Sequence, residues 1–437
     1  MLFSLPLVLL IIVIIAAAFT STDEMNKTRV ATISCSKEMA KKACVFKTLI
    51  GMEPFDTGTV TFNTGLTDAA IKNGLQWILT AQQRDGGWGA GSHQHQDVTD
   101  AHAVPSDPAS TALAGMALLR LEAQPFEGKN AAVLTKAVNY LLRAVESTPQ
   151  QAINITTLTG TQPQVKLGAN IDVILTAQFF SNALHKIGTT NTTLKSQIEK
   201  SLQQCIGKIQ RAQDTDGSFK GGSWAPVLQS ALANNALESA DDAGAKVDST
   251  VLRRSRDYQK GNYNMKTNSA TTSDASGVLL YSISGTARAS AKEANVAMDR
   301  INKAKKEGKL NDKATVTEEN LVVAGYSTAE AKKLATAYKI RGAAAARAQD
   351  ADIISGFGNN GGEEFLSYLM TGESLVIAGG NEWKSWYEKM SGRLAQIQNN
   401  DGSWNGHHCI TSPVICTATC LLILSVNKDI DFLSKVK

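Results

Sequence analysis

The sequence lacks most of the features that assign a function directly. No long run of Lys or Arg occurs, and a formal net charge of +4 over 437 residues is too small to indicate a nucleic-acid partner. Six cysteines in a chain of this length do not form a disulfide scaffold. No Ser/His/Asp triad, phosphate-binding loop or nucleotide fingerprint stands out. These absences leave a globular protein with a sizeable core, since 43% of the residues are hydrophobic.

A long hydrophobic run begins the chain. Residues 1–20 are apolar to about Phe19, and small residues precede the polar stretch that follows, which is the layout of a secretory signal. About 18 apolar residues could also just cross a bilayer as a retained anchor, and a misassigned start is a third reading. The first two predict a secreted, periplasmic or cell-envelope protein. Thiols can be oxidised there, so Cys35 and Cys44 are a candidate local disulfide.

From about residue 68, two kinds of helical segment alternate. One kind has a single apolar stripe, as Leu202, Cys205, Ile206 and Ile209 show, and predicts outer helices. The other, such as residues 417–424, is apolar most of the way round and predicts buried inner helices. The predicted outer and inner partners are 68–83 with 109–124, 131–147 with 168–187, 193–212 with 225–240, 247–260 with 272–284, 333–350 with 362–379, and 381–398 with 413–426. This pattern predicts an all-α fold, an α/α toroid of about six outer–inner hairpins.

A short motif, Gln-x-x-Asp-Gly-(Gly/Ser)-aromatic, recurs at residues 82–88, 213–219 and 398–404. Its Asp residues are separated by 131 residues over two predicted hairpins and by 185 over three, so both intervals give about 60 to 65 residues per hairpin. We expect the Gly to adopt the left-handed conformation that ends the outer helix. We expect Asp85, Asp216 and Asp401 to be structural.

Residues 286–332 interrupt this rhythm and predict a small helical insertion. The segment is rich in Lys and Arg, and it contains the capping boxes Thr315-x-x-Glu318 and Ser327-x-x-Glu330. It is either a solvated face or a docking site for a protein partner. The predicted parts of the chain are therefore the N-terminal segment 1–20, an arm at 21–67, the first part of the toroid at 68–285, the insertion at 286–332 and the second part of the toroid at 333–437.

The repeated motif resembles the QW repeat of squalene–hopene cyclases, and the helical alternation is similar to the toroid of terpene cyclases and prenyltransferase β subunits. The resemblance covers roughly residues 68–427. It implies a central cavity lined by inner helices, an extended apolar ligand, and catalytic groups near the inner-helix N-termini. Of the cyclase motif Asp-x-Asp-Asp, the chain keeps one carboxylate, Asp172. Of the prenyltransferase zinc ligands, Cys416 falls near the His position, and Glu363-Glu364 lies near the Asp-x-Cys position without its cysteine.

Glu363 and Glu364 follow a flexible Gly/Asn run and open an inner helix. One of them could point into the cavity, where an apolar environment raises the pKa of a carboxyl group and makes it a general acid. They are also ordinary partners of a helix dipole. They are our candidate catalytic residues.

In such a ring all outer-to-inner loops lie at one end. Six inner-helix N-termini then surround one mouth, and their partial positive charge favours an anionic group. Lys260, Tyr263 and Lys266 lie in one of these loops, and Trp224 begins an inner helix, so these four are candidate ligand-binding residues. The alternative is that side chains such as Asp107 cap these helices.

Ring closure should bring the first loop next to the last. The first loop contains His93, His95 and Asp97, and the last contains His407, His408 and Cys409, which together form a ligand set typical of zinc. We therefore predict either a zinc site at this seam, a disulfide between Cys409 and Cys416, or neither.

Two classes of function remain. The first is a binding or scaffold protein that holds an extended apolar or anionic ligand and lacks standard cyclase and prenyltransferase activity, because the motifs for both are incomplete. The second is a cavity enzyme, either an isoprenoid cyclase or transferase or a polysaccharide lyase of toroid type, the latter suggested by a likeness to the Asn-Gly-Gly-Trp motif of family-10 pectate lyases. The zinc-ligand motif of prenyltransferases is also incomplete, so neither class of function requires a cofactor.

Overall fold

The computed structural model describes residues 64–188, 191–219, 222–275, 278–350, 353, 361–378 and 382–429. The chain divides into two units, residues 1–44 and 45–437, and all described residues belong to the second. The predicted signal or anchor, the Cys35–Cys44 bridge and nearly all of the predicted arm lie outside the described residues. None of the described helices is both long and apolar enough to span a bilayer.

The second unit consists of outer and inner helices in alternation, as predicted. The outer helices are α3 (Thr64–Thr80), α5 (Ala131–Glu146), α8 (Thr192–Arg211), α10 (Ser249–Gly261), α13 (Thr328–Arg347) and α16 (Glu382–Ile397). The inner helices are α4 (Pro108–Leu121), α7 (Ile171–Lys186), α9 (Pro226–Asp242), α11 (Leu279–Lys306), α15 (Glu363–Ile377) and α17 (Pro413–Leu424).

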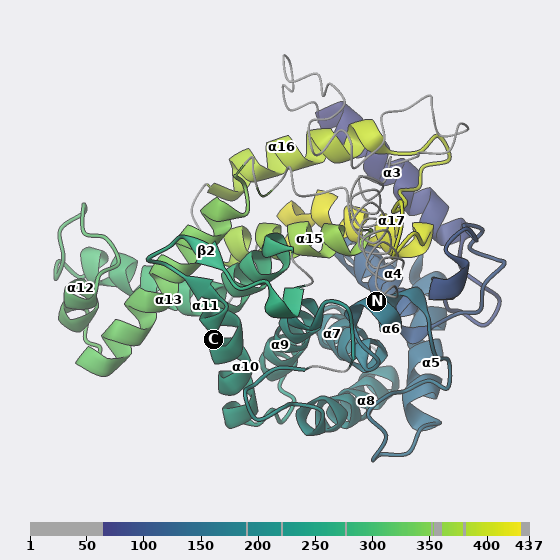
Figure 1. Cartoon of the computed structure of the whole chain (residues 1–437), viewed down its shortest axis with the longest axis horizontal. Helices are drawn as coiled ribbons and strands as arrows, with labels where there is room; N and C mark the ends of the chain where they lie inside the picture. The colour runs from purple at the N-terminus through teal and green to yellow at the C-terminus, as the bar shows by residue number, and fades with distance from the viewer. Residues whose placement is uncertain are drawn as a thin grey trace, which may run out of the picture. The chain divides into compact units, whose positions relative to one another are not determined.

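Within this unit the inner helices form a closed ring (Figure 1). Each contacts the next in the order α4, α7, α9, α11, α15 and α17, and α17 contacts α4 again. The ring is closed by the first and last hairpins, because α3 also packs on α16 and α17. The all-α toroid predicted from the sequence is confirmed. The described exception to helix is a two-stranded antiparallel hairpin of β1 (Tyr263–Asn264) and β2 (Ser269–Ala270).

Burial follows the two kinds of helical pattern. Every residue of α17 is buried, because this helix has neighbours on all sides. In α8 the buried residues form one stripe that includes Leu194, Ile198, Leu202 and Ile209, and the opposite face is polar. The hydrophobic effect therefore assigns each helix to its layer.

The repeated motif ties each of three hairpins to the next outer helix. The side-chain amide of Gln82 donates to Gly86 O and Val133 O, both at 2.9 Å, and Val133 belongs to α5. Gln213 and Gln398 make the equivalent pairs of bonds, to Val251 O of α10 and Ala70 O of α3. The last repeat therefore reaches the first helix of the toroid, which closes the ring.

The other motif residues fasten the turn internally. Asp85 accepts from Gly87 N at 2.9 Å, and the indole N–H of Trp88 donates to Ile78 O at 2.9 Å. Asp216 and Asp401 accept from the matching N–H groups, so the structural role predicted for the three Asp residues is confirmed. The prediction that the Gly ends the helix was wrong in detail. The outer helices end before the Gln, and the Gly, with φ between 90° and 94°, belongs to the turn that follows.

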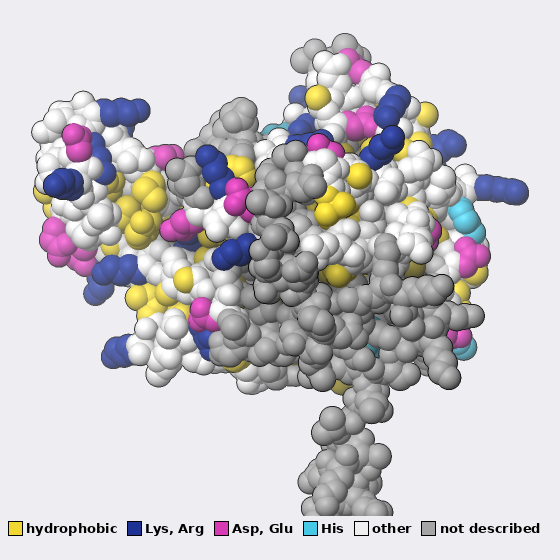
Figure 2. Space-filling model, turned by 90° about the horizontal axis from the view of Figure 1, so that it is seen from above, with side chains coloured by type: hydrophobic (Ala, Val, Ile, Leu, Met, Phe, Trp, Pro, Cys, Tyr) yellow, Lys and Arg dark blue, Asp and Glu magenta, His cyan; other side chains and the backbone are white. Residues whose placement is uncertain are grey.

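The insertion is built differently from the prediction. The single helix α11 runs 28 residues from Leu279 to Lys306, so the predicted boundary at residue 286 falls inside it. Its C-terminal half packs on α12 (Glu318–Val323) and α13 around a small separate core that includes Ile301 and Leu321. The capping box at Ser327 is confirmed. The one at Thr315 was wrong, because Thr317 caps α12 by accepting from Asn320 N. Figure 2 shows Lys and Arg side chains around hydrophobic ones on this insertion, at the left of the view.

Candidate functional site

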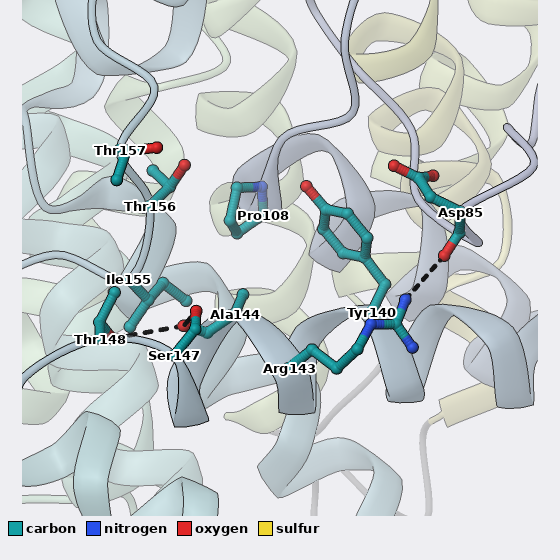
Figure 3. Close-up of a pocket in the computed structure, with 10 residues that line it drawn as sticks. All are labelled: Asp85, Pro108, Tyr140, Arg143, Ala144, Ser147, Thr148, Ile155, Thr156 and Thr157. Atoms are coloured by element: carbon teal, nitrogen blue, oxygen red, sulfur yellow. Dashed lines mark hydrogen bonds between the residues drawn. The ribbon is translucent and has the colours of Figure 1, made fainter.

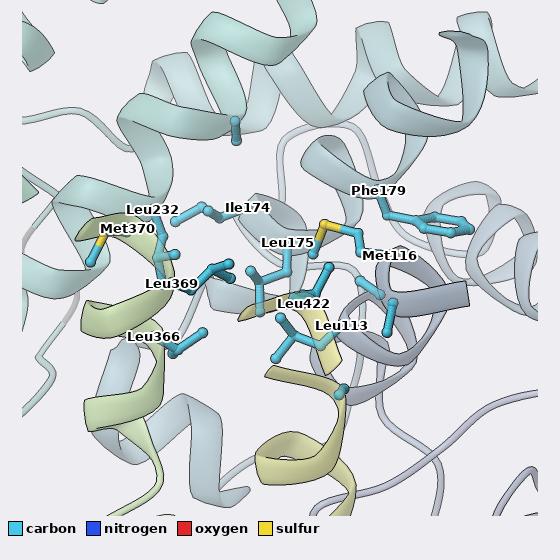
Figure 4. Close-up of a cluster of buried hydrophobic side chains, with 14 of the residues drawn as sticks. Leu113, Met116, Ile174, Leu175, Phe179, Leu232, Leu366, Leu369, Met370 and Leu422 are labelled. Atoms are coloured by element: carbon cyan, nitrogen blue, oxygen red, sulfur yellow. The ribbon is translucent and has the colours of Figure 1, made fainter. Parts of the chain in front are cut away.

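In the part of the chain that the structure describes, side chains pack into the space between the inner helices. Leu113, Met116, Leu175, Leu369 and other apolar residues of α4, α7, α9, α15 and α17 meet there (Figure 4). The cavity that remains among them has a volume of about 20 Å³. That volume accommodates about one water molecule, whereas ligand pockets usually measure roughly 300–1,000 Å³. The predicted isoprenoid chain does not fit at this level of the ring.

A buried chain of charges crosses one side of the ring. Arg120 of α4 donates to Glu373 of α15 at 2.7 Å, and Glu373 accepts from Arg288 of α11 at 3.3 Å. Arg288 also donates to Glu238 of α9 at 3.0 Å, and Glu238 accepts from Arg256 of α10 at 2.7 Å. Burial alone would raise the pKa of Glu238, but the surrounding positive charges, Arg256 foremost, lower it to about 2. Each carboxylate of the chain is thus compensated, and the network holds five helices together.

We call the end of the ring at which the inner helices begin the mouth. Glu363 and Glu364 lie there in the first turn of α15, and both are buried. Gly361 and Gly362 let this turn pack against the last loop. Gly362 N donates to Ile410 O at 2.8 Å, and a Cβ on Gly361 would lie only 1.7 Å from the carbonyl oxygen of His408. The Gly-Gly pair that the sequence suggested as a flexible run is here a close backbone contact.

Glu363 has the electrostatics expected of an acid in a buried site. Burial raises its pKa, and nearby backbone N–H groups and the charge of Lys166 offset this only in part, so the pKa stays above its ordinary value. The hydroxyl of Tyr281, from α11, lies 3.5 Å from Glu363 Oε1. Burial and the negative charge of Glu363 raise the pKa of Tyr281 well above its usual range. Burial thus makes ionisation of Glu363 less favourable than that of an exposed carboxyl group.

The last loop contributes Cys409 to the same mouth. Its backbone has φ of 66°, an uncommon conformation for a residue other than Gly. Its Sγ lies 2.6 Å from His408 Nδ1, and the rings of His407 and His408 have centroids 4.3 Å apart. Burial and Glu363 raise the pKa of the Cys409 thiol to about 11, against the opposing effect of Lys166. The thiol is therefore protonated near neutral pH and is not an activated nucleophile.

The predicted meeting of the first and last loops is confirmed. His93 Nδ1 lies 3.3 Å from Cys409 O, Gln96 accepts from Cys409 N, and Thr411 Oγ1 donates to Gln96 O at 2.7 Å. A residue that the sequence did not single out completes the seam. Gln162, in the short helix α6 (Gln162–Leu167), accepts from Thr411 N at 2.8 Å and from Ser412 N at 3.0 Å.

The predicted metal ligands do not converge. His95 and Asp97 are exposed, and the His93 ring is directed to a carbonyl group. Within the described ranges, no group of three or more His, Cys, Asp and Glu side chains is placed to hold a metal ion. The residues present therefore do not fit a zinc centre, and we derive no chemistry through a metal. Of the alternatives left open at Cys409, the disulfide with Cys416 is not formed in the structure, where both residues are free thiols.

The predicted ligand-binding residues lie in two places. Trp224 belongs to the mouth, where its indole is 61% exposed and Lys166 Nζ lies 4.5 Å from the ring centroid. Lys166 is itself buried, and sequence reasoning missed it. Lys260 is paired with Glu293 at 2.9 Å, while Lys266 is exposed in the β1–β2 hairpin that begins with Tyr263. Of these three, Lys260 is engaged in an ion pair and the Tyr263 hydroxyl donates to Asn268, so we do not include them with Trp224 in the site.

Two further carboxylates lie where α4 and α7 begin. Asp107 caps α4, accepting from Ser110 N at 2.8 Å, as the structural alternative predicted. Asp172, the carboxylate shared with the cyclase motif, accepts from Ala109 N at 3.1 Å and from Gln164 Nε2 at 2.8 Å. Burial and the neighbouring Asp107 raise the pKa of Asp172 to about 7. Both side chains are fully enclosed and act here as ties between helices.

Comparison with known proteins gives one family match. Residues 49–165 match the model of the squalene-hopene cyclase C-terminal domain, which covers the first hairpin and continues through α5 into α6. A search of the curated proteins finds no match. The match is to a cyclase domain by description, and it covers neither Glu363 nor the last loop.

Proposed function

We propose that this chain, by its fold and family match a squalene-cyclase-like and prenyltransferase-like α/α toroid, is a protein that binds an anionic ligand at the mouth of the ring. It does so without isoprenoid cyclisation or transfer inside the ring. The observation that carries the proposal is the packing among the described inner helices, where the cavity lined by Leu113, Leu175 and Leu369 measures about 20 Å³ and is too small for a terpene chain.

The residues of the mouth support an anionic ligand. We call Lys166, Trp224, Tyr281, Glu363 and Cys409 the mouth site. Lys166 is buried beside Glu363 and Cys409, and its positive charge opposes the rise of both their pKa values, so it supplies a cationic group at the mouth. The exposed indole of Trp224 beside that charge offers an apolar surface to the rest of the ligand.

Titration with pyrophosphate, farnesyl diphosphate and farnesol, followed by tryptophan fluorescence, tests this. Pyrophosphate and farnesyl diphosphate should bind with Kd values within about tenfold of each other, since the prenyl tail finds no cavity. Lys166→Met should weaken both at least about tenfold, while the exposed Lys200→Met on α8 should change neither. Tight binding of farnesol, or binding unchanged by Lys166→Met, would contradict the proposal.

A second candidate is an enzyme that uses Glu363 as a general acid. Its burial, raised pKa and contact with Tyr281 favour this function. Glu363→Gln should then fold and bind ligand normally but abolish turnover of the bound compound. Unchanged product formation in Glu363→Gln, followed by mass spectrometry, would remove this candidate.

Export and a protein partner complete the proposal. The apolar segment 1–20 supports delivery to the cell envelope or beyond, and cell fractionation tests it, with recovery of the chain in the cytoplasm as the opposing result. The basic insertion of α11, α12 and α13 supports docking of a protein partner. Deleting α12 should abolish binding of this protein partner without changing the affinity of the mouth site for its ligand.

A further inference from the structure

An open groove beside α5 shares no lining residue with the mouth site. It has a volume of about 520 Å³ and runs between α5, the turn of the first repeated motif and the loop that follows α5. One face of α5 forms its wall, since Tyr140, Arg143, Ala144 and Ser147 recur at helical spacing. Figure 3 shows Thr156 and Thr157 on one side of Pro108, and Tyr140 and Asp85 on the other. The volume is within the usual range for small-molecule sites.

The motif fixes a donor and an acceptor at one end of this groove. Asp85 Oδ1 is held by Gly87 N and by Ser106 Oγ, each at 2.9 Å, so the carboxylate is oriented and its Oδ2 is left for a ligand. Arg143 uses one nitrogen, Nη2, to donate to Asp85 O at 2.9 Å, and its other N–H groups are left for a ligand. A fixed acceptor thus stands beside a fixed donor.

The rest of the lining is a mixture of hydroxyl groups and apolar surface. Ser147, Thr148, Thr156 and Thr157 supply hydroxyls, and the hydroxyl of Thr157 is exposed in the groove. Pro108 and Ile155, with the ring of Tyr140, supply the apolar part. The Tyr140 hydroxyl donates to Ser106 O at 2.9 Å, which holds the ring in place.

The charges around the groove argue against a strongly ionic ligand. The carboxylate of Asp85 is part of the lining and disfavours an anion. The guanidinium of Arg143 at the same place disfavours a cation. A neutral ligand with many hydroxyls suits both, because each hydroxyl can donate to the carboxylate or accept from the guanidinium.

We infer that this groove binds a neutral saccharide, with Asp85 and Arg143 engaging neighbouring hydroxyls and Tyr140 and Pro108 packing on the C–H face of a sugar ring. The inference is independent of the proposed function, since it shares no residue with the mouth site.

Calorimetric titration of the full chain with a panel of neutral tetrasaccharides of glucose, xylose, mannose and N-acetylglucosamine tests the inference. Trigalacturonate and spermidine serve as anionic and cationic probes. At least one neutral oligosaccharide should bind with Kd below about 1 mM. Thr157→Arg, which places a long side chain in the groove, should weaken that binding at least tenfold. Thr159→Arg adds the same charge two residues on, at an exposed position outside the lining, and should leave the affinity unchanged.

The inference is overturned if no neutral member of the panel binds. It is equally overturned if Thr157→Arg and Thr159→Arg bind the sugar as the unmodified chain does, or if only trigalacturonate or spermidine binds. Because pyrophosphate binding at Lys166 is measured separately, failure of one site is distinguishable from failure of the other.

Discussion

At the scale of single residues, the glutamine of the repeated motif is a junction between hairpins. In all three repeats its amide nitrogen donates to two backbone carbonyls, one in its own turn and one in the first part of the next outer helix. The second bond joins the turn of one hairpin directly to the backbone of the next outer helix. The residue therefore fixes the angle between successive hairpins, which is a property of the ring and not of any single helix.

Replacing this glutamine should destabilise the fold. Gln398→Leu removes two side-chain hydrogen bonds, to Ala70 O and Gly402 O, each worth about 0.5–1.5 kcal/mol. We expect the free energy of unfolding in urea to fall by about 1–3 kcal/mol. Gln94→Leu, at an exposed position of the first loop, should change it by less than about 0.5 kcal/mol. Equal effects of the two changes would contradict the junction role.

The motif glycine is required for two reasons, its positive φ and the close approach of the next outer helix, and their costs can be measured separately. Gly217 has φ of 90°, and a Cβ there would lie 2.2 Å from the carbonyl oxygen of Arg254 in α10. Gly160 has φ of 72°, but a Cβ would meet nothing within 4 Å. Gly160→Ala should therefore cost about 1 kcal/mol from backbone strain alone. Gly217→Ala should cost about 2 kcal/mol more, because α10 must move. Thermal and urea unfolding of the two variants measure this difference.

At the scale of helices, the buried carboxylates of α4 and α7 predict a dependence of stability on pH. The pKa of Asp172 is about 7 in the folded chain and near 3.8 when unfolded, so its contribution to stability is fully present below pH 3.8 and is lost as the pH rises through 7. Other groups, such as Glu238, act in the opposite direction, so the comparison must be made with Asp172→Asn, which does not titrate.

The free energy of unfolding of the unmodified chain, minus that of Asp172→Asn, should fall as the pH is raised from about 4 to about 7. Its slope should reach at most about 1.4 kcal/mol per pH unit, and the difference should be flat above about pH 8. Urea titrations at a series of pH values provide the measurement. A difference that grows with pH would show that Asp172 is ionised in the fold.

Helices were predictable where local polarity decides their layer. The predicted 413–426 is α17 at Pro413–Leu424, because an all-apolar stretch has one stable place in a layered fold. Helix α11 was cut short in the prediction, since its pattern changes from fully buried to one-sided as it leaves the ring, with no residue that ends the helix. The contact between the first and last loops at the seam was predictable, because it follows from closure of the ring. The roles of Lys166 and Gln162 were not predictable, because their partners at the seam are about 250 residues away and no local pattern marks them.

At the scale of the whole described unit, the ring is a packed and charge-balanced body. Apolar side chains fill its centre, and ion pairs from Arg120 to Arg256 link the inner helices on one side. At the mouth, buried Glu363 and Lys166 lie close enough for the charge of Lys166 to lower the pKa of Glu363. Filling the centre is the physical reason to place ligand binding at the mouth and not inside the ring.

Photo-crosslinking with a farnesyl diphosphate analogue that carries a diazirine on its prenyl chain tests this placement most directly. The labelled residues are identified by mass spectrometry of the digested protein. The account predicts labelling at the mouth, in the peptides that contain Lys166, Trp224 and Glu363, and loss of that labelling when pyrophosphate competes. Labelling of Leu113, Leu175 or Leu369 at the centre of the ring would contradict it, because these side chains are accessible only if the ring opens to hold the ligand.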